Sequence, residues 1–103
     1  MKFEFANRKL ALLYEVGKGA QKLPPEVYFA FVALIEYIHE INDERTLYTR
    51  KSLHFEKLTG NRKGQSSIRL NDQYRLCFEI IKDKAGNIIW ILDLVDYHYK
   101  EAL

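Results

Sequence analysis

Hydrophobic and polar positions alternate most regularly between residues 66 and 80 of the chain. A period of two along the chain is typical of a β-strand that buries one face. The segment therefore predicts two strands that are separated by a short polar stretch at residues 71–73. The apolar positions of these two strands are Ile68, Leu70, Tyr74, Leu76, Phe78 and Ile80.

The length of the loop between these strands determines which side chains share a face. A two-residue loop would put apolar and charged side chains on the same face of the sheet. A three-residue loop over residues 71–73 pairs Leu70 with Tyr74 and Ile68 with Leu76, so that all four face the core. Asn and Asp tolerate the left-handed backbone that such a loop requires. We therefore predict the three-residue loop.

This register places Arg69 opposite Arg75 on the other face of the sheet. Like charges directly opposed across two strands are destabilising. Two paired guanidinium groups often hold an anion between them, since arginine is well suited to binding phosphate and carboxylate. The alternative is a pair of solvated arginines that point apart. The pattern itself leaves both interpretations open.

Apolar residues at helical spacing predict two helices in the first part of the chain. Asn7 is a suitable cap for a helix over residues 8–16, which Gly17 or Gly19 would end. Pro24 and Pro25 can start a second helix, because proline is tolerated in a first turn. This helix is expected to end at residues 42–44.

Strands account for most of the remaining patterned sequence. Residues 3–5 predict an edge strand. Residues 88–95 form the most apolar strand, which we expect to be the last one and to lie centrally or under both helices. Residues 45–52 look irregular, and residues 83–87 suit a hairpin loop. Residues 53–58 are expected to be a strand with His54 and Glu56 on one face. The whole pattern predicts one α+β domain over residues 1–103, with two N-terminal helices packed on a small antiparallel sheet.

Charge is distributed unevenly along the chain, although the net charge is only +2. Residues 45–75 carry eight Lys or Arg against two Asp or Glu, whereas the segments on both sides are slightly acidic. A basic central segment is the electrostatic pattern expected of a nucleic-acid-binding protein. The alternative is a basic face that is merely solvated.

Other features exclude several classes of protein. No apolar run is long enough to span a membrane, and the N-terminus has no signal-peptide pattern, so we expect a cytoplasmic protein. The single cysteine, Cys77, cannot form an internal disulfide, and we expect it to be a packing residue. One cysteine and three histidines match no zinc-binding spacing, so neither a metal nor another cofactor is predicted.

Asp96, Tyr97 and His98 follow the last apolar strand, where a sheet edge can form a cleft. Histidine exchanges protons near neutral pH, aspartate can orient it, and tyrosine can stack on a base. Strand geometry would place Asp96 and His98 on the same side. A half-buried terminal histidine beside an aromatic residue is the structural alternative.

The ordered segment from Gly60 to Phe78, followed by Val95-Asp96-Tyr97-His98, closely resembles the HigB-like toxins of the RelE/ParE superfamily. The family pattern is a Lys-Gly-Asp-Arg-x-Gly turn, then Ser-Ile-Arg-x-Asn-Asp-Gln-[Trp/Tyr]-Arg-[Ile/Leu]-x-Phe, and a terminal Asp-Tyr-His. The resemblance covers most of the chain and implies a RelE-like fold. It also implies a type II toxin that cleaves mRNA on the ribosome and is inhibited by a HigA-type helix-turn-helix antitoxin.

The same resemblance assigns roles to individual residues. Arg75 matches the arginine that holds the scissile phosphate, and Asp96, Tyr97 and His98 match the terminal active-site residues. Basic positions that would face RNA are Arg62, Lys63, Arg69 and, in a gapped alignment, Lys57.

The chain departs from the family pattern just before Gly60. Family members often read His-Pro-Leu-Lys-Gly-Asp-Arg, whereas an ungapped alignment puts Glu56 at the histidine position. A two-residue shift restores His54 and Lys57 instead. Either His54 or Glu56 could therefore be the second proton-transfer group beside His98. The alternative function is a non-nucleolytic ParE-like toxin or binding module, which would act on another target such as DNA gyrase.

Overall fold

The computed structural model describes residues 1–97 and 101–102, and it combines helices with one mixed sheet. The helices are α1 (Arg8–Val16), α2 (Pro25–Glu40) and α3 (Arg45–Thr49). The strands are β1 (Lys2–Phe5), β2 (Glu56–Lys57), β3 (Ser66–Arg69), β4 (Tyr74–Asp83), β5 (Gly86–Asp96) and β6 (Glu101–Ala102). Short 3₁₀ turns are η1 (Ala20–Lys22), η2 (Lys51–Leu53) and η3 (Gly60–Arg62).

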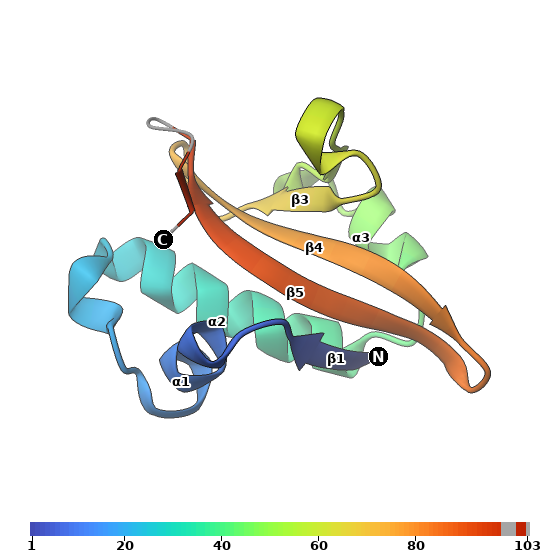
Figure 1. The fold of residues 1–103 in the computed structure, drawn as a ribbon, viewed down its shortest axis with the longest axis horizontal. Helices are drawn as coiled ribbons and strands as arrows, with labels where there is room; N and C mark the ends of the chain where they lie inside the picture. The colour runs from blue at the N-terminus through green and yellow to red at the C-terminus, as the bar shows by residue number, and fades with distance from the viewer. Residues whose placement is uncertain (98–100, 103) are drawn as a thin grey trace.

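The sheet has the strand order β1-β5-β4-β3-β2, and β6 also pairs with β5. The predicted α+β architecture is confirmed, and β5 is an interior strand between β1 and β4. One detail of the prediction is wrong, because the sheet is not purely antiparallel: β1 runs parallel to β5. The strand over residues 88–95 is also not the last one, since β6 follows it. Figure 1 shows α1 and α2 together on one side of the long β4–β5 pair.

Helix α1 has the boundaries that its sequence predicts. The side-chain oxygen of Asn7 accepts a hydrogen bond from the backbone N–H of Leu10 at 2.9 Å, which caps the helix. Gly17 ends it in a left-handed conformation with φ of 70°, and its N–H donates to the Leu13 carbonyl at 3.1 Å. A side chain at this position would also approach the Tyr28 hydroxyl at 3.1 Å.

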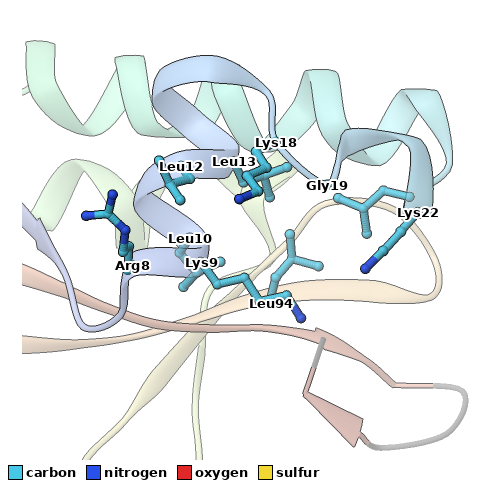
Figure 2. A pocket seen from close by; sticks show the side chains of 10 residues that line it. Arg8, Lys9, Leu10, Leu12, Leu13, Lys18, Gly19, Lys22 and Leu94 are labelled. Carbon is cyan, nitrogen blue, oxygen red and sulfur yellow. The ribbon is translucent and has the colours of Figure 1, made fainter.

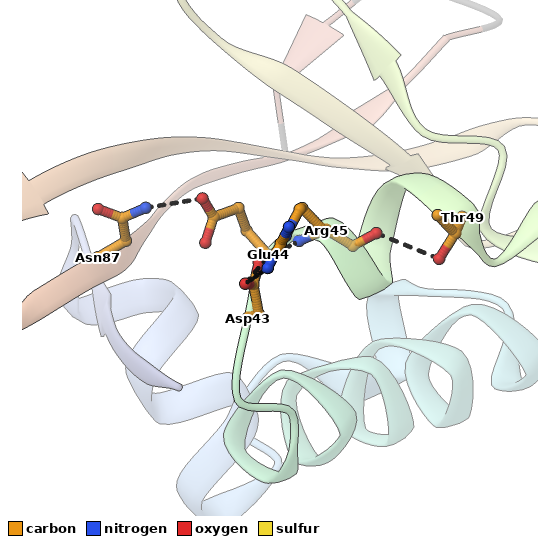
Figure 3. Close-up of polar contacts among 5 residues, drawn as sticks. All are labelled: Asp43, Glu44, Arg45, Thr49 and Asn87. Atoms are coloured by element: carbon orange, nitrogen blue, oxygen red, sulfur yellow. Dashed lines mark hydrogen bonds and ion pairs between the residues drawn. The ribbon is translucent and has the colours of Figure 1, made fainter.

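The segment after α2 is more ordered than the sequence analysis expects. Helix α2 ends at Glu40, and the region predicted to be irregular contains α3 and η2. The Asp43 carboxylate accepts from the backbone N–H of Arg45 at 2.8 Å, while its other oxygen pairs with the Arg45 guanidinium. Asn87 donates to Glu44 at 2.8 Å and so links this connection to β5 (Figure 3). A local hydrogen bond from the Arg45 N–H to the Asp43 carboxylate therefore precedes a helix that is too short to show a hydrophobic period.

The loop between β3 and β4 confirms the predicted register. Leu70 bonds to Tyr74 across a three-residue loop, Ile68 lies opposite Leu76, and Arg69 lies opposite Arg75. The Asn71 side chain fixes this loop, because its oxygen accepts from the N–H groups of Gln73 and Tyr74 at 2.9 and 2.7 Å. The hairpin between β4 and β5 is tighter than predicted, with only residues 84–85 between the strands.

An irregularity in β5 changes the face of the sheet to which its alternate side chains point. Cys77 pairs with Asp93 but Phe78 pairs with Ile91, so Leu92 is an extra residue on β5. This extra residue allows both Ile91 and Leu94 to join the core beneath the helices, although they are three positions apart. It also sets the direction of every β5 side chain beyond it.

The hydrophobic core lies between α1, α2 and one face of the sheet. Its fully buried residues include Val27, Phe31, Ile35, Ile38, Ile68, Leu76, Phe78, Ile89 and Ile91. Leu47 of α3 is also buried in this core. The opposite face of the sheet carries the Arg69–Arg75 pair.

Phe31→Ala is expected to lower the free energy of unfolding by about 3–5 kcal/mol, because it leaves a cavity at a fully buried position. Phe29→Ala is the matched control. Phe29 lies on the same helix but is 67% exposed, so its loss should change stability by about 0.5 kcal/mol or less. Urea unfolding of both variants provides the measurement, and equal destabilisation would contradict this assignment of the α2 faces.

Candidate active site

A polar pocket of about 280 Å³ opens on the sheet face opposite α1 and α2. Residues from β2, β3, β4, the β3–β4 loop and the position directly after β5 meet there. They are Glu56, Arg69, Asn71, Asp72, Arg75 and Tyr97. The pocket therefore contains both arginines whose opposition the sequence predicts.

Arg75 is the most buried charge in the pocket, with a side chain only 13% exposed. Its Nε donates to the Ser67 hydroxyl at 2.8 Å, and its guanidinium also donates to the His54 carbonyl. The Glu56 carboxylate lies 3.7 Å away and forms an ion pair with it. The Ser67 hydroxyl and the His54 carbonyl thus fix the position of Arg75. The carboxylate that pairs with it, Glu56, is exposed to solvent.

Tyr97 completes the wall beside Arg75. The guanidinium carbon lies 5.8 Å from the centre of the Tyr97 ring, within the range of a cation–π contact. The Tyr97 N–H donates to the Gln73 carbonyl at 2.7 Å, which ties the end of β5 to the β3–β4 loop. Tyr97 is therefore held where it can contact a molecule bound to Arg75.

Arg69 lies on the outer side of the same pocket. It forms an ion pair with Asp72, and its guanidinium nitrogen lies 3.4 Å from Nε2 of His54. Asp72 is 91% exposed, so solvent weakens this pair. Each arginine thus has its own carboxylate partner, Asp72 for Arg69 and Glu56 for Arg75, and both carboxylates are accessible to solvent.

His54 and Glu56 both reach this region, but not by the predicted geometry. The strand expected over residues 53–58 is reduced to Glu56–Lys57, because His54 has a left-handed backbone with φ of 47°. The two residues therefore do not share a strand face, and that prediction is wrong. Glu56 contacts Arg75 through its side chain, whereas His54 contacts Arg75 through its carbonyl and Arg69 through its ring.

Asp96 lies on the other face of the sheet from Arg75. It pairs in register with Tyr74, a core residue, and is buried. The side-chain nitrogen of Gln73 donates to both of its carboxylate oxygens, at 3.0 and 3.1 Å. In this arrangement Asp96 fixes the loop that precedes β4. His98, the third residue of the predicted group, lies outside the described residues.

The predicted RNA-facing positions differ in how they are held. Lys57 and Lys63 are exposed. Arg62 is instead partly buried, and it donates to Asp93 at 2.8 Å and to Gln65 at 2.7 Å. Burial acts to lower the pKa of Arg62, but the hydrogen bond to Asp93 and nearby negative groups outweigh this effect and raise it.

Cys77 lies under the Arg62–Asp93 ion pair and is fully buried. Burial raises the pKa of the Cys77 thiol, so it stays protonated at neutral pH. This agrees with the expected packing role. Asp93 was not among the predicted site residues, although a single carboxylate inside an apolar strand is a recognisable sign of a buried partner.

The pocket offers a fixed cation, an aromatic ring and exposed carboxylates, and the His54 imidazole contacts Arg69, one of its lining residues. That set suits binding of a phosphodiester with an adjacent proton-transfer group. No cluster of three or more His, Cys, Asp or Glu side chains that could hold a metal occurs among residues 1–97 and 101–102. In the same part of the chain, no helix has the length and apolar character needed to cross a membrane.

Comparison with known proteins places this pocket in context. Residues 3–98 match the model of a family described as the RelE-like toxin of the type II toxin–antitoxin system HigB. The chain is 34% identical over 87 residues to Toxin HigB-1 from Vibrio cholerae serotype O1, and the match covers 84% of this chain and 92% of that protein. The fold is similar to that of a YoeB/ParE toxin from Agrobacterium tumefaciens, with a TM-score of 0.57 and 15% identity over 91% of this chain and 96% of that one.

Proposed function

Because the chain belongs to the HigB-like family of RelE-like toxins of type II toxin–antitoxin systems, we propose that it is a ribosome-dependent mRNA endoribonuclease inhibited by a HigA-type antitoxin. We further propose that it acts in the cytoplasm, where translating ribosomes are found. The observation that carries the proposal is the position of Arg75, which is fixed at the base of a polar pocket beside Tyr97 and Glu56.

The proposed reaction uses the 2′-hydroxyl of the mRNA as the nucleophile. It requires a base for the hydroxyl proton, an acid for the leaving 5′-oxygen and a cation for the charge on the phosphorane. No metal is assigned a role in this proposal, because protein side chains can fill all three positions.

Arg75 is the proposed cation and binds the scissile phosphate. Arg69 is the second arginine that would contact this phosphate. An incoming phosphate would compete with Glu56 and Asp72 for these guanidinium groups. Both carboxylates are largely exposed, at 59% and 91%, so their pairs are weak and can be exchanged for a phosphate at low cost. Glu56 would then be released beside the phosphate, where it could accept a proton.

The remaining roles are assigned from the family pattern and the pocket together. His98 is the proposed acid or base, and Tyr97 stacks on a base or donates a hydrogen bond. His54 or Glu56 is the second proton-transfer group, and the contact between Glu56 and Arg75 supports Glu56. Asp96 supports the site by holding Gln73, rather than by facing the phosphate.

Basic residues around the pocket are proposed to bind RNA at the decoding site. Lys57 and Lys63 are exposed and would contact phosphates directly, as would Arg69. Arg62 would contribute mainly by keeping η3 in place through Asp93. The proposed ribosomal substrate fits the excess of positive charge in residues 45–75.

Arg75→Ala should slow cleavage of mRNA on programmed ribosomes by about 10²–10³-fold, the usual cost of removing one transition-state donor. Arg50→Ala is the matched control. Arg50 has the same side chain in the same basic segment, but it stacks on Tyr37 at 4.5 Å and does not line the pocket. Cleavage at the wild-type rate by a folded Arg75→Ala protein would refute the phosphate role, and absence of any mRNA cleavage by the wild type would favour a ParE-like target such as DNA gyrase.

His98→Gln should reduce single-turnover cleavage by about 10²–10⁴-fold, since glutamine cannot transfer a proton near neutral pH. His54→Gln should have a smaller effect if Glu56 is the second group, and Glu56→Gln should then show the larger loss. The His54 carbonyl can still accept from Arg75 in the His54→Gln protein, so this variant tests the imidazole alone. Unchanged cleavage by His98→Gln would refute its role in proton transfer.

A further inference from the structure

Strand β1 forms one edge of the sheet, because it pairs with β5 on one side only. Among the described residues no strand lies along its outer side, as Figure 1 also shows. The strand at the opposite edge, β2, has only two residues, whereas β1 has four. An edge strand presents backbone groups that can pair with another chain. The outer side of β1 is therefore the place where this sheet is best able to accept a further strand.

The backbone groups on the outer side of β1 belong to Phe3 and Phe5. The Ala6 N–H, directly after the strand, donates to the Ile91 carbonyl of β5 at 2.7 Å. Backbone N–H and C=O groups alternate in direction along a strand, so those of Glu4 also point toward β5. Those of Phe3 and Phe5 consequently point away from β5, toward the side where a further strand would bind.

The side chains of β1 alternate between the two faces of the sheet. Phe3 and Phe5 pack against the hydrophobic core. Lys2 and Glu4 are exposed on the other face, which also carries the pocket around Arg75. The strand thus presents one positive and one negative side chain on the face that lies away from α1 and α2.

One antiparallel register of two copies of β1 satisfies both faces. It places Phe3 opposite Phe3 of the second copy, so that each Lys2 lies opposite Glu4 of the other copy. The two Phe3 residues then exchange hydrogen bonds between their outward N–H and C=O groups. A shift of one residue would put charged side chains opposite phenylalanine. A shift of two would put Glu4 opposite Glu4 or Lys2 opposite Lys2, and opposed like charges are destabilising.

Charged side chains on an edge strand can also prevent pairing with another chain. A single lysine has this effect because it repels its own copy. Lys2 and Glu4 instead attract each other between two copies in the register that the phenylalanines require. The charge pattern of β1 is therefore complementary to itself, which favours a second copy of this chain as the occupant of the edge.

We propose that two copies of this chain associate through β1 and form one continuous sheet. The twofold axis would run perpendicular to the sheet, so both pockets around Arg75 would open on the same side. The start of β1 is already fixed, because the Met1 ammonium donates to the carbonyls of Ile38 and His39 at 3.0 Å each. The strand therefore loses little freedom on pairing, which lowers the cost of association.

The proposed interface is separate from the pocket around Arg75 and from a larger hollow. That hollow, of about 440 Å³, lies between α1, η1 and β5 (Figure 2). Neither of the two is lined by a residue of β1. Pairing through β1 consequently does not depend on the proposed nuclease activity, and a failure of either proposal would leave the other standing.

Sedimentation velocity over a range of concentrations tests the proposal, with any purification tag at the C-terminus so that the Met1 contacts stay intact. The wild type should form a dimer at concentrations on the order of 100 µM, since a short paired edge makes a small interface. Lys2→Glu should raise the dimer dissociation constant roughly 10-fold or more, because it opposes like charges at both symmetric positions. Lys82→Glu is the matched control, because it changes the net charge equally at an exposed position of β4 outside the interface. It should leave the constant within about twofold of the wild type.

The double variant Lys2→Glu and Glu4→Lys tests the register itself, because it restores opposite charges at the same positions. Its dissociation constant should return to within about threefold of the wild type, whereas Glu4→Lys alone should weaken the dimer as Lys2→Glu does. Both residues are exposed, so circular dichroism should show an unchanged fold in all these variants. Recovery by the double variant would separate a direct contact between copies from a loss of stability.

Amide hydrogen exchange followed by NMR identifies the strand that pairs. The Phe3 N–H should exchange more slowly as the concentration rises through the range of dimer formation, because it gains a carbonyl partner only in the dimer. The Glu4 N–H points toward β5 within one copy and is the internal control. Its exchange should not change with concentration.

Three results would overturn the proposal. The first is a wild type that stays monomeric across the whole concentration range. The second is a dimer that Lys2→Glu leaves intact, or that the double variant does not restore. The third is a Phe3 N–H that becomes protected only when the antitoxin is added, which would assign this edge to a strand of the antitoxin.

Discussion

The three-residue loop between β3 and β4 fixes the register on which the rest of the molecule depends. The Asn71 side chain holds this loop by accepting two backbone hydrogen bonds. A shift of β4 by one residue against β3 would turn Leu76 away from the helices and Arg75 toward them. The loop therefore separates an apolar face that builds the core from a polar face that builds the pocket.

The extra residue in β5 has a comparable effect at the other side of the sheet. Leu92 changes the direction of the chain so that Asp93 faces Cys77 and Arg62. Beyond it, Tyr97 reaches Arg75, whereas Asp96 lies with Tyr74 on the face covered by helices. Two adjacent residues of one motif thus have separate tasks: Tyr97 lines the pocket and Asp96 holds Gln73.

The sequence predicted those features that follow from periodicity and local capping. The start and end of α1, the start of α2, the β3–β4 register and the opposed arginines all have local signals, such as Asn7, Gly17 and the alternation around residues 71–73. The parallel pairing of β1 with β5 joins segments more than 80 residues apart and has no local signal. The short helix α3 likewise follows local contacts of Asp43 with the backbone and the guanidinium of Arg45, which leave no hydrophobic period.

The candidate site was predicted less completely than the fold, because its geometry depends on irregular backbone. The sequence indicated Arg75, Arg69 and Tyr97, which the structure brings together, and it left His54 and Glu56 as alternatives. The left-handed backbone of His54 could not be foreseen, since positive φ is uncommon for a residue other than glycine. This conformation turns the His54 carbonyl toward Arg75 and leaves Glu56 as the carboxylate that contacts it.

We propose that Arg75 stabilises attack by the 2′-hydroxyl of an mRNA held in the ribosome. The most direct test is to identify the new ends of an mRNA that the purified wild-type protein has cut on a programmed ribosome. We expect a cut within the codon in the decoding site, with a 2′,3′-cyclic phosphate or its 3′-phosphate product on the upstream fragment and a 5′-hydroxyl on the downstream one. A 3′-hydroxyl on the upstream fragment would contradict it, because water rather than the neighbouring 2′-hydroxyl would then have attacked the phosphate.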